Sequence, residues 1–297
     1  MKVLFIGCVQ SSYELIQTLH GLPTASITGI VTKQVSDTNA DHVSLVPFAE
    51  RHSIPYHDYE GDRQLRQWLA KIEYDVIYCF GWSHLLSADV IASARLGAIG
   101  YHPTLLPMNR GRHPIIWALA LGLTETGSTF FLIDQGSDSG DIVSQERVTI
   151  GDEDDARTLY DRLMAAAKRQ IVRLTNDLYE GKLQAIPQND SMSNYWRKRN
   201  ANDGLIDWRM SSRKIFNLVR ALRRPYVGAH CIYKGEQPKV WKVQIVAAND
   251  QLANVEPGKV LRVESDSRSL DIKTGDGIVR LIEHTFSSIP AEGEYIR

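Results

Sequence analysis

The chain opens with Met1-Lys2-Val3-Leu4-Phe5-Ile6-Gly7-Cys8, an unbroken apolar run that ends at a glycine. Two runs of the same kind follow, Ile27-Thr28-Gly29-Ile30-Val31 and Val76-Ile77-Tyr78-Cys79-Phe80. Apolar runs without polar alternation predict strands that are covered on both faces, as in a parallel sheet. Helical patterns alternate with these runs, at Ser12 to Leu19, Asp62 to Ile72 and Ser87 to Ala94. This order predicts an open α/β sheet, whose ligands gather at the carboxyl ends of the strands.

Charge and composition exclude several classes of protein. Lys and Arg number 34 and Asp and Glu number 35, so the formal net charge is −1, which excludes a globally basic nucleic-acid binder. The first apolar run is far shorter than the ~20 residues that a bilayer span requires, and no processing pattern follows it. The three cysteines lie far apart, without CxxC or His-rich neighbours. We therefore expect a cytoplasmic protein with no membrane association, no disulfide framework and no metal site.

A long amphipathic helix is predicted from Asp152 to Leu178, because an acidic start precedes apolar positions at helical spacing and Gly181 ends the pattern. The polar segment from Gln184 to Asp203 loses all periodicity. We therefore predict two domains, residues 1–185 and 186–297.

The second domain changes in character. A short helix is expected from about Ser212 to Leu222. Short alternating stretches follow, at Ala229 to Tyr233, Val240 to Val246, Gly258 to Val263 and Gly277 to Ile282. Their spacing predicts a small, all-β, barrel-like domain.

Two loops carry residue types that suggest chemistry. The stretch Gly97-Ala98-Ile99-Gly100-Tyr101-His102 reads as a short strand, and it leads into a loop fixed by prolines up to Pro114. A second loop, Asp134-Gln135-Gly136-Ser137-Asp138-Ser139-Gly140-Asp141, is dense in acids and glycines. A His and an Asp on adjacent loops are the parts of a general base with its orienting carboxylate. On spacing alone, a structural histidine and an ordinary turn remain the alternative.

The same loops carry a resemblance to a known family. Tyr101-His102-Pro103-Thr104-Leu105-Leu106-Pro107, then Arg110-Gly111, and then Asp134-x-Gly136-x-Asp138-Ser139-Gly140-Asp141-Ile142 resemble the signature of the folate-dependent formyltransferases. In the second domain the resemblance extends to Gly204-Leu205-Ile206-Asp207-Trp208, Arg220-Ala221-Leu222 and Lys239-Val240-Trp241. The family's fold is a Rossmann-like catalytic domain followed by a barrel-like (OB-type) domain, which agrees with the patterns above.

The resemblance implies 10-formyltetrahydrofolate as the formyl donor and a catalytic set of an Asn, a His two residues later and an Asp in the second loop. By position, His102 is that histidine and Asp138 that aspartate. The asparagine position is Gly100, which has no side chain to hold the formyl oxygen. Losing one such donor typically lowers the rate by ~100-fold or more. We consider His113, Asn109 or a bound water as its replacement.

The resemblance places the donor over the loop Phe80-Gly81-Trp82-Ser83-His84-Leu85-Leu86. Gly81 would allow close backbone approach, and Trp82 and Leu86 would cover the flat pteridine. Phe80, Ser83 and Asp134 are further candidates for contact with the donor. Trp82 could alternatively be a core residue, and we interpret His84 as a surface or helix-start residue.

Two acceptor classes compete. The loop Lys33 to His42, where the tRNA formyltransferases carry a basic loop, has one Lys against two Asp, too few cations to track phosphates. The stretches Tyr195 to Trp208 and Arg223 to Ala229 resemble sugar N-formyltransferases instead. Candidate diphosphate contacts are Arg110, Arg112 and the cluster Arg197-Lys198-Arg199, whose alternative is a solvated basic face. The other candidates for acceptor binding are Gln10, Ser11, with Ser12 beside them, Tyr101 and His113.

We therefore expect a sugar-nucleotide N-formyltransferase that uses 10-formyltetrahydrofolate. The alternatives are a methionyl-tRNA formyltransferase and a folate-binding relative with weakened catalysis, which Gly100 would explain. We expect no nucleic-acid partner, and the family resemblance makes a homodimer reasonable.

Overall fold

The computed structural model describes residues 1–36, 41–247, 252, 254–264 and 266–297, which form two compact units. The first unit comprises Met1–Pro114, Thr126–Val148 and Asp161–Arg197. The second comprises Ile115–Glu125, Thr149–Tyr160 and Lys198–Arg297. The predicted boundary between residues 185 and 186 falls inside the last stretch of the first unit. Two short segments that the prediction assigns to the first domain lie in the second unit.

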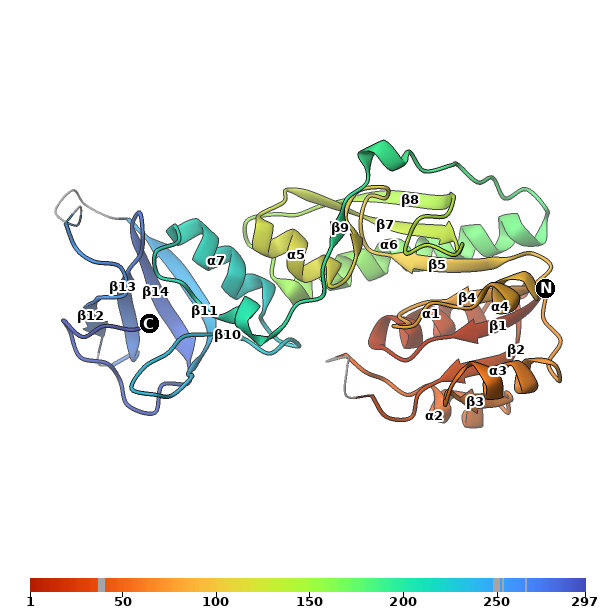
Figure 1. Ribbon diagram of the computed structural model, residues 1–297, viewed down its shortest axis with the longest axis horizontal. Coiled ribbons are helices and arrows are strands. Elements are labelled where there is room, and N and C mark those ends of the chain that lie inside the picture. Colours follow the sequence, from red (N-terminus) through yellow and green to blue (C-terminus); the bar gives the residue numbers. More distant parts are fainter. Residues whose placement is uncertain (37–40, 248–251, 253, 265) are drawn as a thin grey trace. The chain divides into compact units, whose positions relative to one another are not determined.

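The first unit is built on a seven-stranded sheet with the order β3-β2-β1-β4-β5-β7-β8 (Figure 1). Neighbouring strands from β3 to β5 are parallel, whereas β7 runs antiparallel to β5. The bounds are β1 Lys2–Ile6, β2 Ser26–Thr32, β3 Tyr56–Asp58, β4 Val76–Cys79, β5 Ala98–His102, β7 Glu125–Leu132 and β8 Ile142–Thr149. The prediction of an open, mostly parallel sheet is therefore confirmed. A separate two-stranded sheet pairs β6 (Arg110–Gly111) with β9 (Tyr195–Trp196).

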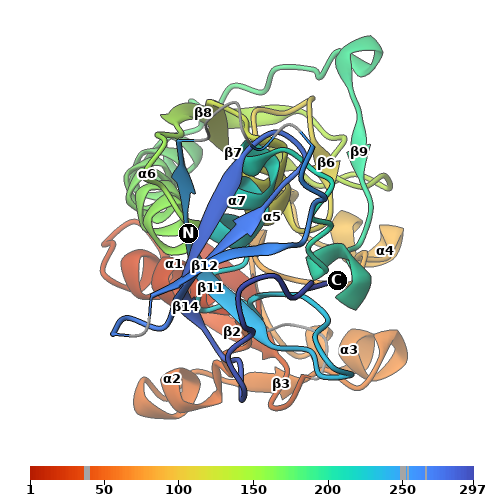
Figure 2. The same ribbon diagram turned by 90° about the vertical axis from the view of Figure 1, so that its left-hand side faces the viewer.

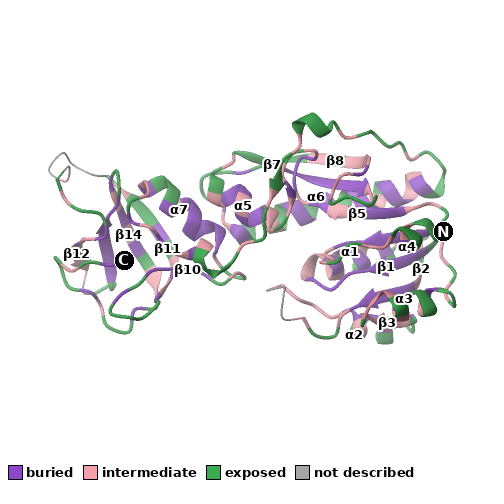
Figure 3. Cartoon of the chain, in the orientation of Figure 1, coloured by how far each residue is buried: buried purple, intermediate pink, exposed green. Residues whose placement is uncertain are grey.

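Helices cover both faces of this sheet, and its central strands are buried (Figure 3). On one face, α3 (Asp62–Leu69) and α4 (Ala88–Ala92) pack on a cluster of buried residues that includes Leu4, Ile6 and Ile77. On the other, α1 (Gln10–His20) and α6 (Ala156–Tyr179) are joined by an ion pair between Glu14 and Lys168, 2.5 Å apart. The remaining helices are α2 (Val46–Arg51), α5 (Pro114–Leu121) and α7 (Ser212–Ala221). No helix of the described residues combines the length and the apolar character that a membrane span would need.

The second unit contains an antiparallel five-stranded sheet with the order β10-β11-β14-β13-β12. Its strands are β10 Ala229–His230, β11 Lys239–Val246, β12 Val260–Glu264, β13 Ser269–Lys273 and β14 Ile278–His284. Helix α7 lies against β11 and β14 (Figures 1 and 2). Strand β13 is absent from the predicted stretches because its charged residues mask the alternation, although every residue in it is buried.

The segment Gly293–Arg297 closes this sheet. On one side, Val260 N donates to Glu294 O at 2.8 Å and Ile296 N donates to Gly258 O at 2.9 Å. On the other, Arg297 N donates to Ile232 O, just after β10, at 2.9 Å. The segment thus joins the two edge strands, and the barrel-like prediction is confirmed.

Buried Arg220 on α7 explains why the segment 149–160 belongs to the second unit. Its Nη1 donates to the carbonyl oxygens of Gly151, Asp152 and Asp154 at 2.9, 3.2 and 3.2 Å. Burial lowers the pKa of this guanidinium.

Arg199, a predicted diphosphate contact, lies 4.8 Å from the ring centroid of Trp117 and donates to Asp203 O. Both contacts lie within the second unit.

Candidate active site

His102 lies at the end of β5 and is only 5% exposed. Its Nε2 lies 2.8 Å from the carbonyl oxygen of Asn109. Because a carbonyl can only accept, Nε2 carries the proton, and the lone pair of the neutral ring is on Nδ1. Nδ1 lies 3.8 Å from Oδ2 of Asp138. The imidazole is therefore oriented as a base, with a carboxylate beside the atom that would take up a proton.

Asp138 reaches His102 from the loop between β7 and β8. Its backbone is in the left-handed region, with φ of 56°. Its Oδ2 accepts a hydrogen bond from Gly111 N at 2.8 Å, so the carboxylate is held between the two predicted loops. The structure thus brings together the His and the Asp that the sequence predicts as a pair.

Gly100 is buried on β5 opposite Phe131 of β7. A Cβ atom built on Gly100 would lie 2.7 Å from Cζ of Phe131 and 3.1 Å from Cγ1 of Ile133. The space that a side chain at this position would take is thus occupied by the Phe131 ring. Gly100 itself can contribute only backbone atoms to a site.

Tyr101 was predicted as an acceptor contact, and the structure places it elsewhere. Successive residues of a strand point to opposite faces, so Tyr101 points away from the face of Gly100 and His102. Its ring packs 4.9 Å from that of Phe130, and its hydroxyl accepts from Ser128 at 3.3 Å. Burial raises the pKa of this phenol. Tyr101 is therefore a partly buried residue that packs against Phe130.

The loop after β4 begins with two tightly held residues. Phe80 is fully buried among aromatic rings, and its carbonyl accepts from Ser12 Oγ at 2.6 Å. Gly81 follows with φ of 63°, where an added Cβ would lie 2.1 Å from Cγ2 of Val9. Phe80 therefore has no side-chain surface for a donor, whereas Gly81 lies at the turn where the predicted pocket begins.

An aromatic cluster with one cation follows in the same loop. Trp82 is partly buried, 5.1 Å from the ring of Tyr59, and Lys33 lies 5.5 and 5.9 Å from the Tyr59 and Trp82 ring centroids. Lys33 Nζ donates to His84 Nε2 at 2.8 Å. Burial, together with the charges of Lys33 and Arg112, lowers the pKa of His84. No local pattern groups Lys33 and Tyr59 with Trp82, because these residues follow three different strands. Residues 37–40, in the loop after Lys33, lie outside the described part of the chain.

The remaining predicted contacts lie on several loops. Exposed Arg112 donates from Nη2 to Ser83 O at 2.8 Å, which brings it beside the loop of the aromatic cluster. Leu86 is partly buried in the same loop. Gln10 and Ser11 begin α1, and Gln10 Nε2 donates to Glu14 at 3.3 Å. His113 precedes α5 with φ of 55°.

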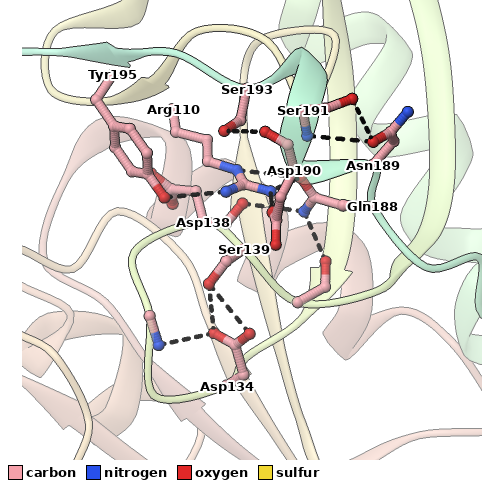
Figure 4. Close-up of polar contacts among 12 residues, drawn as sticks. Arg110, Asp134, Asp138, Ser139, Gln188, Asn189, Asp190, Ser191, Ser193 and Tyr195 are labelled. Carbon is pink, nitrogen blue, oxygen red and sulfur yellow. Dashed lines mark hydrogen bonds and ion pairs between the residues drawn. The ribbon is translucent and has the colours of Figure 1, made fainter.

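Asp134 and Arg110 are both engaged within the protein (Figure 4). The Asp134 carboxylate accepts from Gly136 N at 2.9 Å and from Ser139 Oγ at 2.8 and 3.0 Å, which shapes its own loop. Arg110 is 2% exposed, and its guanidinium donates to three side chains of the segment after α6. They are Gln188, at 3.2 Å from Nε and 2.8 Å from Nη2, Asp190 at 2.8 Å and Tyr195 at 2.9 Å. Arg110 is therefore not available to a diphosphate, and its partners lie in a segment that sequence patterns describe only as polar.

In the parts of the chain that the structure describes, no three His, Cys, Asp or Glu side chains are gathered to hold a metal ion. The polar residues that do converge, His102 and Asp138, suit proton transfer.

Solved structures with a similar fold include three proteins. The first is WlaRD, a sugar 3N-formyl transferase crystallised with dTDP and 5-N-formyl-THF, at 16% identity with a TM-score of 0.69, over 97% of this chain and 99% of that one. The second is an N-formyltransferase from Helicobacter canadensis in complex with folinic acid and dTDP-3-aminofucose, at 15% identity with a TM-score of 0.67, over 96% and 100%. The third is HypX from Aquifex aeolicus in complex with tetrahydrofolic acid, at 16% identity with a TM-score of 0.65, over 97% of this chain and 44% of that one. At these identities the likeness shows a shared fold.

Family membership follows from the sequence itself. A family model described as formyl transferase matches residues 17–175, and a second, described as the formyl transferase C-terminal domain, matches residues 198–292. The first covers both loops that carry His102 and Asp138. The chain belongs to the formyl transferase family.

Proposed function

We propose that the protein transfers a formyl group from 10-formyltetrahydrofolate to the amine of a nucleotide-linked amino sugar. The observation that carries this proposal is the orientation of His102, whose proton-free Nδ1 lies beside Asp138. Two proteins of similar fold support the substrate classes, since both were crystallised with a folate compound and with dTDP or a dTDP-sugar.

The proposed chemistry assigns a role to each member of the pair. The donor supplies an electrophilic formyl carbon. An amine that forms a bond to this carbon must lose a proton, and His102 Nδ1 is the atom that would accept it. The bond between the formyl carbon and N10 of the donor would then break, and N10 would take the proton back from the imidazolium as tetrahydrofolate leaves. The Asp138 carboxylate, 3.8 Å away, would stabilise the resulting imidazolium. Gly100 has no side chain that could donate a hydrogen bond to the formyl oxygen. We therefore propose that Asn109 or His113 supplies this hydrogen bond.

Some of the residues in the loop after β4 suit the flat ring system of the formyl donor. Trp82 and Leu86 are partly buried and offer apolar surface, and Gly81 allows close backbone approach. We keep these three, with Ser83 and Asp134, as the proposed donor contacts. Phe80 is not among them, because its side chain is fully buried.

For the acceptor, Arg112 remains the proposed diphosphate contact, and Lys33 joins it. Both are linked to the loop of residues 83–84, Arg112 through Ser83 O and Lys33 through His84. In the described part of the chain, no carboxylate lies within ion-pair distance of Lys33, so its charge is available to an anion. Gln10, Ser11 and His113 are the proposed contacts to the sugar or the nucleotide. We also propose that the protein is a homodimer.

A second candidate function is folate binding without turnover. The Phe131 ring at Gly100 favours it, because the family's asparagine has no space here. The two functions are separated by incubating the protein with 10-formyltetrahydrofolate and a panel of nucleotide-linked amino sugars, with charged methionyl-tRNA as comparison. Mass spectrometry should show one formyl group on a sugar nucleotide. Folate binding without any formylated product would support the second candidate, and formylation of the tRNA alone would contradict the sugar acceptor.

A further inference from the structure

A short segment after α6, residues 188–196 and here called the strap, lies along both loops that contact His102. It contains a 3₁₀ turn at Asp190–Met192 and strand β9, which pairs in parallel with β6. Figure 4 shows three of its side chains, those of Gln188, Asp190 and Tyr195, converging on Arg110. The pattern of the sequence identifies this segment only as a polar linker, and the structure gives it a defined place in the first unit.

The strap fixes the loop that contains Asn109, whose carbonyl accepts from His102 Nε2. Asn109 N donates to Asn194 Oδ1 at 2.8 Å, and Arg110 N donates to Asn194 O at 3.0 Å. Gly111 has φ of 103°, and a Cβ there would lie 2.4 Å from Trp196 O. Only glycine therefore permits this close approach of the strap.

The strap also fixes the loop that contains Asp138. Gln188 Nε2 donates to the carbonyl oxygens of Asp138 and Gly140 at 2.9 and 2.6 Å. Its Oε1 accepts from Nε and Nη2 of Arg110. One side-chain amide thus connects the Asp138 loop to the residue that follows Asn109.

Arg110 holds this connection in place. Burial opposes its charge, but hydrogen bonds to Asp190 and Tyr195 outweigh burial and raise the pKa of its guanidinium. A planar guanidinium with its donors directed at three residues has little freedom to reorient. Arg110 therefore keeps Gln188, Asp190 and Tyr195 at fixed positions relative to β6.

We infer that the strap is a positioning element for the proposed catalytic base: Asn194 and Gln188 set the places of Asn109 and Asp138, the two polar partners of His102, and so the direction of Nδ1. This inference rests on the proposed function. Because the two partners are reached by separate strap residues, a change at either residue should disturb the histidine while the substrates still bind.

The kinetic test compares Gln188→Ala and Asn194→Ala with Ser191→Ala. Among the described residues, the Ser191 hydroxyl bonds only to Asn189, which is itself in the strap. Misplacement of a reacting group by about 1 Å lowers a rate by about 100-fold, so kcat should fall by that order in the first two variants and stay unchanged in the third. KM for donor and acceptor should change by less than about threefold, as expected for an effect confined to the transition state. Gln188→Glu keeps the acceptor for Arg110 and loses both donors to the Asp138 loop, so it serves if Gln188→Ala does not fold.

An exchange measurement makes the inference independent of activity. Amide hydrogen exchange followed by NMR should show faster exchange of Gly111 N–H in Gln188→Ala or Gln188→Glu, because Asp138 Oδ2 no longer stays in reach, and of Asn109 N–H in Asn194→Ala. Both amides should keep wild-type rates in His102→Ala and Ser191→Ala. Unchanged exchange of Gly111 in both Gln188 variants, or unchanged kcat in a folded variant, would overturn the inference. If the wild type formylates no acceptor while the exchange changes are seen, the proposed function fails and the positioning of Asp138 by the strap stands.

Discussion

The ring of Phe131 occupies the place into which a side chain at residue 100 would project, because a Cβ on Gly100 would lie 2.7 Å from its Cζ. The two residues face each other across β5 and β7. The glycine at position 100 therefore leaves no empty space for an asparagine side chain, because the Phe131 ring fills it.

Restoring the asparagine should be harmful in this background. Gly100→Asn forces Phe131 to move, and overpacking of this kind costs about 1–3 kcal/mol of unfolding free energy, measured by urea denaturation. Formyl transfer should fall as well. Gly181→Asn is a matched control, because its φ of 68° suits asparagine and a Cβ there meets nothing within 4 Å. A gain of activity in Gly100→Asn would contradict this prediction.

Combining Gly100→Asn with Phe131→Ala tests whether the two residues compete for one space. Phe131→Ala alone should cost about 3–5 kcal/mol because it leaves a cavity. The added asparagine should then cost less than it does beside Phe131, which a double-mutant cycle in urea denaturation detects. Strict additivity of the two changes would show that they do not compete.

The roles of His102 and Asp138 can be separated by isosteric changes. His102→Asn removes the base and should lower kcat for formyl transfer by about 100-fold or more. Asp138→Asn keeps an acceptor for Gly111 N–H but loses the negative charge beside Nδ1, so kcat should fall while circular dichroism stays that of the wild type. Gln135→Ala, at an exposed position of the same loop, is the control. Wild-type rates in both variants would remove the basis for the proposed enzyme.

Lys33 and Arg112 should act on binding and not on the chemical step. A charge-assisted hydrogen bond contributes about 1.5–3 kcal/mol, so Lys33→Ala or Arg112→Ala should raise KM for the sugar nucleotide by about tenfold or more, with kcat little changed. Calorimetry with dTDP should show the same weakening. Lys71→Ala removes an exposed positive charge after α3 and should leave both values unchanged. An effect on the folate compound alone would assign the two cations to the donor.

The pH dependence of stability should include a contribution from His84. Its pKa is lowered in the folded state, first by burial and then by Lys33 and Arg112, so the unfolded chain binds the extra proton more readily. Stability from the neutral ring is therefore fully present above the ordinary histidine pKa of about 6.5 and is lost as the pH falls below it. The unfolding free energy of His84→Gln should fall less steeply between about pH 7 and 5 than that of the wild type. If the unfolding free energies of the two proteins fall equally steeply with pH, folding does not remove water from the His84 ring and this prediction is wrong.

Sequence patterns predict the parts of this protein that depend on local order. The buried parallel strands follow from unbroken apolar runs, and His102 and Asp138 follow from a strand end and an acidic loop. The role of Arg110 depends on Gln188, which lies 78 residues away, and no local pattern reveals such a pairing. Lys33 and Trp82 likewise meet only because β2 and β4 lie on either side of β1. Strands β7 and β8 do not stand out in the sequence because their polar residues, such as Thr129, interrupt the apolar pattern.

The way in which the chain divides between its two units limits how the protein can be recombined with its relatives. A chimera joined at a single point in the polar linker would take residues 115–125 and 149–160 from one parent and residues 198–297 from the other. The carbonyl oxygens of Gly151, Asp152 and Asp154 would then come from one parent, and Arg220, which donates to them, from the other. Exchange of the second unit between family members should therefore give folded proteins more often when these two inserts travel with the barrel, as a three-part cassette.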